Sequence, residues 1–459
     1  MKSNLTYTIK ENIANYFGLT LPIWMQSRKS LLIYYFLDLA IFIFFYLSNS
    51  IKTTSIDNLK LLSLSLSWGL FSYIFGRYSR ENKYSKAIIQ IYYLLIKTIF
   101  VLIFVYIVDK IILIFIPFLF PIGRNSFLLI GISSAFIQSL RLILLNSLNK
   151  KNKSIFIFGE EDDIKTFKKE SKNFLKNKNT NILKMDCISD LFLIKERDFK
   201  TIVIASEGIK FDNSEFLINE TFKNNLEILN KSEWFEKYVH KIPSQFISLN
   251  FINYTNKYIN SNKIHMRIKR MADVFLSLIL LFLTFPIIFV VALLIKLEDN
   301  GPIFYNQVRT GLFEQPIIIR KLRSMKINSE NNGAVWANKN DKRITKIGRL
   351  IRKTRIDELP QLISVLKGEM SLIGPRPERP EFNILLENKI PHYNLRHLVK
   401  PGLSGWAQVN YPYGSSYKDA NNKLSYDLFY ISNYSIFLDL IILFKTMRTI
   451  FSGKGSTPH

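Results

Sequence analysis

The chain of 459 residues is poor in cysteine and in negative charge. Its single cysteine, Cys187, excludes an intramolecular disulfide framework and a metal site built only of cysteines. A cleavable signal peptide is not expected, because no apolar region precedes Leu31 and no small-residue cleavage site is visible. Acidic residues number 36 against 62 Lys and Arg, which gives a formal net charge of +26.

This excess of positive charge does not belong to an ordinary soluble protein. Hydrophobic residues make up 48% of the chain and aromatic residues 14%. Disordered basic tails lack so much apolar content, and a soluble nucleic-acid binder has the charge without long apolar runs. A membrane protein with basic cytoplasmic surfaces accounts for both properties.

Apolar runs dominate the first 150 residues and predict four transmembrane helices. They cover residues 31–47, 59–76, 87–108 (continued at 111–122) and 127–148. Basic groups at 2–29, 77–86 and 150–153 all fall on one side of this arrangement, which predicts that the N-terminus and everything after residue 150 are cytoplasmic. The alternative, buried core helices of a large soluble protein, is disfavoured because the runs have almost no polar face.

Residues 151–262 predict a small Rossmann-like α/β domain. The segments SIFIFGEEDD at 154–163 and TIVIASEG at 201–208 read as buried strands followed by turns. A dinucleotide-binding loop has the pattern G-x-G-x-x-G, but here Gly159 is followed by four acidic residues, which would repel phosphate. We therefore expect a structural or regulatory spacer here, without bound nucleotide.

A fifth apolar run, at 271–295, has Pro286 near its middle. Proline removes a helix hydrogen bond and bends the axis. Basic residues precede the run and a basic region follows it, so the charge bias puts both ends on the cytoplasmic face. This predicts a re-entrant helix that breaks at Pro286 and returns. The alternative, a fifth full span, would put the C-terminal region outside.

The C-terminal region, from 263 to 459, carries the residues suited to chemistry. Between Arg320 and Arg355, twelve Lys or Arg accompany two acids, which indicates an anionic partner or a lipid-facing surface. Asp357 and Glu358 follow, at the predicted start of a helix, where the positive end and nearby arginines favour their ionised forms. An ionised Asp beside phosphate can hold Mg²⁺ or attack phosphorus. On spacing alone, a plain helix-capping acidic pair is the favoured interpretation.

Two further segments are turns. In GPRPERP at 374–380, prolines around Arg376 predict a rigid turn that presents a fixed guanidinium, either to a phosphate or as a structural corner. In KPGLSGW at 400–406, the glycines and the aromatic residue predict a loop without a readable mechanism.

These segments together resemble the bacterial sugar transferase family, the polyprenyl-phosphate hexose-1-phosphate transferases or monotopic phosphoglycosyl transferases. The resemblance covers about 264–455 and is carried by several long motifs in the family's order. They are KRMAD at 269–273, GPIFYNQVRTG at 301–311, KLRSM at 321–325, RIDELPQL at 355–362, GEMSLIGPRP at 368–377 and VKPGLSGWAQVN at 399–410. The four-helix region and the α/β domain resemble the long form of this family by architecture.

The resemblance implies transfer of hexose 1-phosphate from a UDP-hexose, UDP-glucose or UDP-galactose, to undecaprenyl phosphate, with release of UMP. This is the first membrane step of exopolysaccharide, capsule or O-antigen synthesis. It implies that Asp357 forms a phosphosugar–aspartate intermediate, and that Asp357 and Glu358 hold Mg²⁺. It also implies an inner-membrane protein whose catalytic domain lies on the cytoplasmic face, and it leaves a homodimer open.

Other roles follow from the same resemblance. Substrate-binding residues would be Arg352, Lys321, Arg323, Pro375, Arg376 and Pro377. Lys269 and Arg270 would lie at the headgroup level, and Pro286 would break the re-entrant helix, although Phe285 stands where the family usually has Ser. An alternative function is an inactive membrane regulator or scaffold of polysaccharide assembly. A membrane-tethered nucleic-acid binder is suggested by charge alone, without a readout motif, and nucleic acid is not an expected partner.

Overall fold

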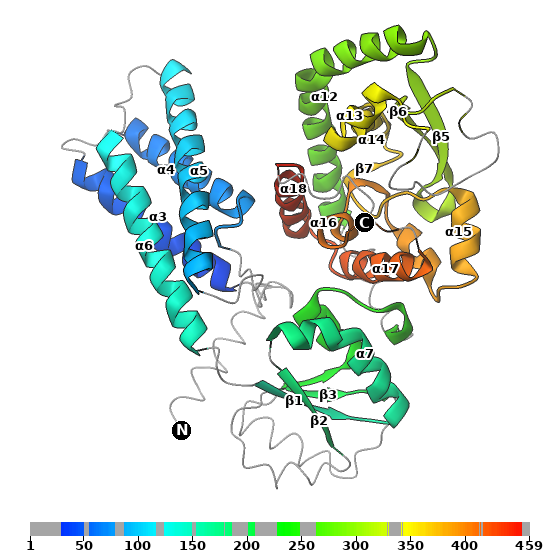
Figure 1. The fold of residues 1–459 in the computed structure, drawn as a ribbon, viewed down its shortest axis with the longest axis horizontal. Helices are drawn as coiled ribbons and strands as arrows, with labels where there is room; N and C mark the ends of the chain where they lie inside the picture. Colours follow the sequence, from blue (N-terminus) through cyan, green and yellow to red (C-terminus); the bar gives the residue numbers. More distant parts are fainter. Residues whose placement is uncertain are drawn as a thin grey trace. The chain divides into compact units, whose positions relative to one another are not determined.

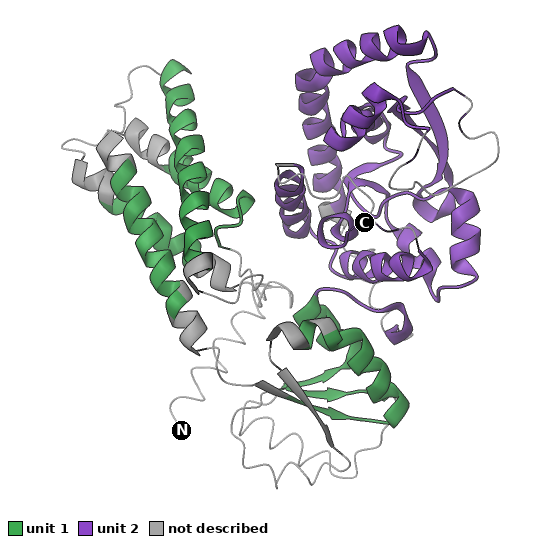
Figure 2. Cartoon of the chain, viewed as in Figure 1, with its two compact units in different colours: residues 1–239 green, residues 240–459 purple. Residues whose placement is uncertain are grey.

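The computed structural model describes residues 29–49, 55–78, 87–115, 124–148, 153–178, 180–185, 201–206, 227–247, 263–327, 329, 341, 343–412, 414 and 416–451 (Figure 1). The chain divides into two compact units, residues 1–239 and 240–459 (Figure 2). Cys187, most of the predicted flanking basic groups and the continuation at 116–122 lie outside the described residues. The predicted domain boundaries 1–150, 151–262 and 263–459 stay predictions.

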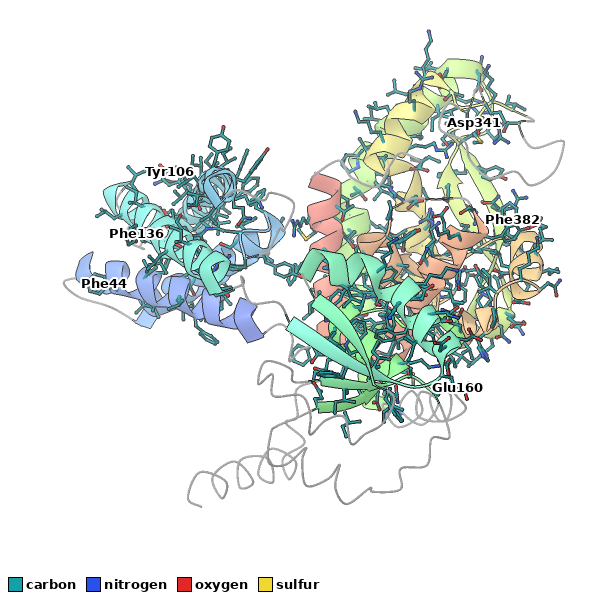
Figure 3. The ribbon with its side chains drawn as sticks, turned by 60° about the horizontal axis from the view of Figure 1, so that its bottom comes forward. Phe44, Tyr106, Phe136, Glu160, Asp341 and Phe382 are labelled. Atoms are coloured by element: carbon teal, nitrogen blue, oxygen red, sulfur yellow. The ribbon has the colours of Figure 1, made fainter. Side chains whose placement is uncertain are left out.

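Four apolar helices begin the first unit, and each coincides with one predicted run. They are α3 (Lys29–Asn49), α4 (Ser55–Ile74), α5 (Ala87–Phe115) and α6 (Arg124–Leu148). Phe42, Trp68, Val101 and Ile130 form a buried cluster between them. Large apolar side chains also point outward, as Phe44, Tyr106 and Phe136 do in Figure 3. An apolar surface of this kind is suited to a lipid environment.

Membrane-spanning length is met by two helices of the described part. The qualifying segments are Gln90–Ile114 in α5 and Met266–Asp299 in the second unit, whereas the apolar parts of the other N-terminal helices are shorter. Most of the described elements are helices, and two of these helices are long and apolar enough to cross a membrane. Both properties are compatible with a membrane protein.

A buried ion pair lies inside this group of helices. Arg77 Nη1 is 2.6 Å from Asp38 Oδ2, and neither side chain is exposed. Trp68 Nε1, Tyr78 Oη and Gln138 Nε2 also donate to the Asp38 carboxylate. A buried carboxylate requires such partners, because an isolated charge is very costly away from water. The sequence grouped Arg77 with the exposed charges after the second run, and the structure places it inside instead.

A parallel sheet follows in the first unit, as expected for an α/β region. Its strands β1 (Lys153–Phe158), β2 (Thr180–Met185), β3 (Thr201–Ile204) and β4 (Glu227–Asn230) have the order β2-β1-β3-β4. Helix α7 (Glu161–Lys178) packs on β1 and β2. Asp163, in its first turn, pairs with Lys231 Nζ at 2.7 Å and accepts from Ser206 Oγ. A protein carboxylate thus lies at the helix start where a dinucleotide-binding loop would receive phosphate.

Helix α12 (Lys263–Asp299) opens the described C-terminal region and contains Pro286. Figure 1 shows this green helix changing direction sharply along its length. Proline is a common cause of such a bend, since it lacks the N–H that would bond the preceding turn. Much of the helix surface is apolar and exposed: Phe282 is 81% and Leu297 79% accessible. Placement of this bent helix in one leaflet stays a prediction.

The remaining elements build the body of the second unit around short strands. The pairs are the antiparallel hairpin β5 (Phe304–Thr310) and β6 (Pro316–Leu322), and the parallel pair β7 (Ser371–Ile373) and β8 (Gly402–Ser404). The helices are α13 (Lys346–Thr354), α14 (Leu362–Lys367), α15 (Pro380–Glu387), α16 (Trp406–Asn410), α17 (Tyr417–Ser432) and α18 (Ile436–Phe451).

Short 3₁₀ or π turns connect these elements. They are η3 (Leu312–Glu314), η4 (Ile356–Gln361) and η5 (Tyr393–Leu398) in the body, with η1 (Phe235–Val239) and η2 (Ser244–Phe246) near the boundary of the two units. The short α-helix α10 (Lys231–Trp234) precedes η1.

Candidate active site

The carboxylates Asp357 and Glu358 lie in η4, directly after a sharp turn. Helix α13 ends at Thr354, and Arg355 adopts a left-handed conformation with φ of 61°. The chain then runs through η4 into α14, so a helical segment begins at Ile356, close to the predicted start. Pro360 lies within η4, where its missing N–H is tolerated. The turn buries both carboxylates, which are 7% and 8% exposed.

Three cationic side chains surround Glu358. Arg376 Nη2 lies 2.5 Å from Oε1, and Lys321 Nζ lies 3.2 Å from the same oxygen. Arg355 Nη1 is 3.5 Å from Oε2. Although burial raises it, Arg376, Lys321 and Arg355 together hold the pKa of Glu358 well below its usual value. Glu358 is thus an ionised carboxylate whose charge is already balanced by the protein.

Asp357 is in the opposite situation. Its Oδ1 is buried and has no hydrogen-bond partner among the described residues. Burial, and then the charge of Glu358, raise the pKa of Asp357 to about 6, although Lys321, Arg352 and Arg355 act the other way. The sequence-based expectation that its surroundings favour the ionised form is therefore wrong for Asp357 and correct for Glu358. Desolvation and the charge of Glu358 outweigh Lys321 and the two arginines, and the burial that causes the desolvation is not visible in local sequence.

Arg352 contributes an unsatisfied donor to the same region. Its charge acts on Asp357, and its buried Nη1 lacks a hydrogen-bond partner in the described part of the chain. A carboxylate oxygen and a guanidinium N–H that both lack partners among the described residues suit a phosphate ligand, whose oxygens can accept from Arg352 and whose phosphorus can react with Asp357. Arg352, Lys321 and Arg376 are therefore brought together with the carboxylates, as the motifs implied.

The turn around Arg376 is held by hydrogen bonds to four successive carbonyl groups. Gly402 N donates to Pro375 O at 2.8 Å, and Arg396 Nη2 donates to Arg376 O at 2.8 Å. Arg309 Nη1 donates to Pro377 O at 3.1 Å, and Thr310 N donates to Glu378 O at 2.9 Å. The donors come from three segments outside the turn, namely β5, η5 and β8, so the turn is fixed on several sides. These four hydrogen bonds, together with the prolines, hold the turn in a conformation that directs the Arg376 guanidinium toward Glu358.

The glycine-rich motif at 399–410 supports that turn. Strand β8 pairs with β7, and the two backbones approach closely at Gly374 and Gly402. A Cβ on Gly374 would lie 2.3 Å from Lys400 O, and one on Gly402 would lie 2.0 Å from Gly374 N. Only glycine fits both positions. The loop that had no readable mechanism is therefore a scaffold for the Arg376 turn.

Three other predicted residues pair with groups outside the carboxylate pair. Arg323 pairs with Asp299 at the end of α12. Lys269 Nζ lies 2.7 Å from Asp439 and donates to Ile373 O. Arg270 donates to the last carbonyl groups of α14. These three residues attach α12 to the body of the unit, and the predicted headgroup contact of Lys269 and Arg270 stays a prediction.

Sequence reasoning missed three arginines of this site. Arg355 was counted in the basic run without a role, yet it pairs with Glu358. Arg309 and Arg396 each hold a carbonyl group of the Arg376 turn, and Arg396 also pairs with buried Asp427 at 3.0 Å. Only a match to a long motif could have marked Arg309, and nothing in local sequence distinguishes Arg396.

The carboxylate pair can be compared with the needs of Mg²⁺, which prefers oxygen ligands. Asp357 Oδ1 is a buried oxygen of this kind, without a hydrogen-bond partner in the described ranges. Both Glu358 oxygens already face cations, so Glu358 would reach a metal ion only by giving up part of that pairing. The donor set is compatible with the ion, which Asp357 would hold as its principal ligand.

Comparison with known proteins covers the second unit. Residues 264–453 match the family described as bacterial sugar transferase. The UDP-N-acetylgalactosamine-undecaprenyl-phosphate N-acetylgalactosaminephosphotransferase of Aeromonas hydrophila is 47% identical over 193 residues, which are 42% of this chain and 46% of that one. The UDP-glucose:undecaprenyl-phosphate glucose-1-phosphate transferase of Klebsiella pneumoniae is 41% identical over 197 residues, 42% of each chain.

The match thus spans less than half the length of these two relatives. A shorter protein, the exopolysaccharide production protein PSS of Rhizobium leguminosarum bv. phaseoli, is 39% identical over 195 residues, which are 41% of this chain and 98% of that one. The matched region therefore corresponds to nearly the whole of a relative.

Proposed function

The chain belongs to the bacterial sugar transferase family, and on that premise we propose that it transfers a sugar 1-phosphate from a UDP-sugar to undecaprenyl phosphate and releases UMP. The observation that carries the proposal is the contrast between two adjacent carboxylates. Glu358 is neutralised by three cations, whereas the buried Oδ1 of Asp357 has no partner among the described residues. Asp357 is thus the group left free to react.

In the first step, an Asp357 oxygen attacks the phosphorus that bears the sugar. The new O–P bond forms as the P–O bond to UMP breaks, which leaves a phosphosugar–aspartate. In the second step, an oxygen of undecaprenyl phosphate attacks the same phosphorus and releases Asp357 as a carboxylate. Each step passes charge to phosphate oxygens, which Arg352 and Lys321 can bind. A pKa of about 6 leaves Asp357 mostly ionised at neutral pH and more basic than an ordinary carboxylate.

Mg²⁺, held mainly by Asp357 with Glu358 beside it, would neutralise charge on the diphosphate of the donor. The protein itself supplies orientation. Arg376 is fixed by its turn and faces Glu358, so the pair can position the nucleotide part or the lipid phosphate without reorganisation. Arg323, Pro375 and Pro377 keep their predicted substrate-binding roles within this proposal.

The donor sugar is the open choice within this reaction. The family resemblance favours UDP-glucose or UDP-galactose, and the relatives are named for glucose and N-acetylgalactosamine. A panel of these UDP-sugars therefore belongs in the assay. The product would enter exopolysaccharide, capsule or O-antigen synthesis.

We propose a topology that brings this site to the lipid. Helices α3–α6 cross the bacterial inner membrane, the β1–β4 region forms a Rossmann-like cytoplasmic domain, and α12 enters and leaves on the cytoplasmic face. Support comes from the apolar exposed surface of α12, from its bend, and from the basic flanks. A homodimer stays a prediction.

The test is UMP release from each UDP-sugar by the full chain in nanodiscs with undecaprenyl phosphate. Wild type is expected to turn over one or more of them, and Asp357→Asn is expected to lose at least about 1,000-fold in kcat, because a covalent nucleophile is removed. Asp162→Asn is the matched control, since Asp162 has a 96% exposed side chain on α7.

Mass spectrometry supplies a second readout. Donor without lipid acceptor should add the mass of a phosphosugar to the peptide that contains Asp357. Full activity in Asp357→Asn would exclude the nucleophile, and a wild type without turnover of the whole panel would favour the regulator or scaffold function.

A further inference from the structure

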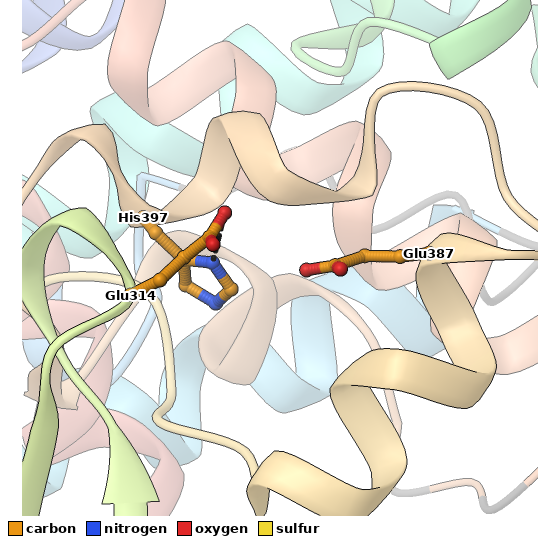
Figure 4. Close-up of side chains that lie close together, drawn as sticks. All are labelled: Glu314, Glu387 and His397. Carbon is orange, nitrogen blue, oxygen red and sulfur yellow. Dashed lines mark ion pairs between the residues drawn. The ribbon is translucent and has the colours of Figure 1, made fainter.

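A second group of potential ligands lies in the same unit, outside the residues used above. It consists of Glu314, Glu387 and His397, whose ligand atoms all lie within 4.8 Å of one another. Figure 4 shows the two carboxylates converging on the imidazole ring. Glu314 lies in η3, at the tip of the β5–β6 hairpin, and Glu387 is the last residue of α15. His397 lies in η5. Proximity of acidic groups alone would not make a site.

The imidazole supplies an independent observation. The His397 side chain is only 8% exposed, and its Nδ1 lacks a hydrogen-bond partner in the described part of the chain. That nitrogen faces Glu314 Oε1 at 3.9 Å, which is too long for a hydrogen bond (Figure 4). Because zinc lies about 2 Å from each of its ligands, a separation of 3.9 Å is one that two ligands of the same ion can have.

The other side of the ring has a candidate orienting partner. His397 Nε2 lies 3.4 Å from Asn383 Nδ2, and the buried Asn383 Oδ1 is itself unpartnered in the described chain. A half-turn of the amide would let Nε2–H donate to Oδ1. That hydrogen bond would satisfy both atoms and leave the Nδ1 lone pair directed at the carboxylates, as in metal-bound histidines.

The electrostatics agree with this geometry. Burial, with the charge of Arg396, lowers the pKa of His397 to about 3, so the ring is neutral and can offer a lone pair. Burial and the nearby Glu314 raise the pKa of Glu387. The geometry supplies the argument for a cation, because the imidazole and the two carboxylates place three ligand atoms within 4.8 Å of one another.

We infer that Glu314, Glu387 and His397 bind a divalent first-row transition metal ion, with zinc as the best representative. Imidazole nitrogen and carboxylate oxygen are both zinc ligands, and one imidazole, two carboxylates and a water would complete a four-coordinate site. Magnesium and calcium prefer oxygen ligands alone, and the imidazole selects against them. This site is separate from the proposed Mg²⁺ ligands Asp357 and Glu358.

The ion would join three segments that lie far apart in the chain. Its position has a consequence for the Arg376 turn, because His397 follows Arg396, which donates to Arg376 O. A metal bound to His397 would hold η5 against the hairpin and α15. It would act as a structural clamp and would not touch the substrate.

The test uses the purified full chain in detergent, stripped with chelator and titrated with zinc against a chromophoric competitor. Wild type is expected to bind one equivalent, and Glu387→Gln to bind more than about tenfold more weakly. Glu314→Gln should behave in the same way. Both glutamates are exposed, so these variants should fold even where His397→Gln does not. Glu381→Gln, on the same helix α15, is the matched control and should bind as wild type does.

Thermal unfolding gives the second measurement. Zinc should raise the Tm of wild type and of Asp357→Asn, but not that of Glu387→Gln. Equal zinc affinity in wild type and in both glutamate variants would overturn the inference, as would a wild type that binds no zinc. Loss of binding in Asp357→Asn alone would assign the zinc to the carboxylate pair and would also overturn it. Because Asp357→Asn is expected to be inactive and to retain zinc, failure of this site and failure of the transferase proposal are distinguishable.

Discussion

The environment of Asp357 predicts that the wild-type carboxylate costs the folded protein stability. Its pKa is raised to about 6 in the folded chain, against about 3.9 for an Asp in an unfolded chain. The protonated form is therefore favoured by folding. The stability contribution is fully present below about pH 4 and is lost as the pH rises through about 6. Asn at this position removes the charge and its pH dependence while keeping nearly the same shape.

The expected magnitude follows from the shift. About two pKa units correspond to about 3 kcal/mol at pH 8, and to roughly half of that at pH 5, where the folded carboxyl is mostly protonated. For a unit of this size, Asp357→Asn should then raise Tm by about 6–12 °C at pH 8 and by about half as much at pH 5. The measurement is thermal unfolding of the full chain in detergent, followed by fluorescence at both pH values.

A control of opposite sign is available on α15. A backbone hydrogen bond, with Arg379, lowers the pKa of the exposed Glu381, so its ionised form favours the folded state. Glu381→Gln should therefore give no stabilisation at pH 8. A lower Tm for Asp357→Asn than for wild type at pH 8, or a difference that does not change with pH, would refute the reasoning about the buried carboxylate.

Two further predictions concern the support of the Arg376 turn and the topology. Arg396→Met leaves Asp427 as an unpaired buried charge and should cost about 3–5 kcal/mol, whereas Arg396→Met with Asp427→Leu should recover most of that. The double variant should still lose up to about tenfold in kcat/KM, because the donor to Arg376 O is gone. Unfolding measurements report the stability effect, and UMP release reports the effect on activity. Full activity in the double variant would contradict the positioning role of Arg396. A reporter fused at the C-terminus should read as cytoplasmic if α12 is re-entrant, and a periplasmic signal would show a full span.

The helices and the carboxylate pair were predictable because their signals are local. The apolar runs coincide with α3–α6, and the carboxylate pair lies near the start of a helical segment, as expected. Pro286 lies within α12, and that helix bends. Such features depend on periodicity, on proline chemistry and on contiguous motifs.

Long-range contacts were not predictable in the same way. Arg77 looked like a loop charge, but Asp38, which lies 39 positions earlier in the chain, draws it into the interior. The ion pair between Arg323 and Asp299, which lies 24 positions earlier, was not predicted either, and the substrate-binding role of Arg323 stays a prediction. In each case the decisive partner lies far away in sequence, and local charge patterns carry no information about it.

The sequence by itself determined the family, the apolar helices and the position of the carboxylate pair, because these depend on contiguous residues. Only the tertiary structure decided that Glu358 is balanced by three cations while Asp357 keeps a free oxygen and a raised pKa. It also brought Glu314 and Glu387 to the buried ring of His397. Burial and pairing are properties of segments brought together by folding, and they set the charge state and reactivity that residue type alone leaves undetermined.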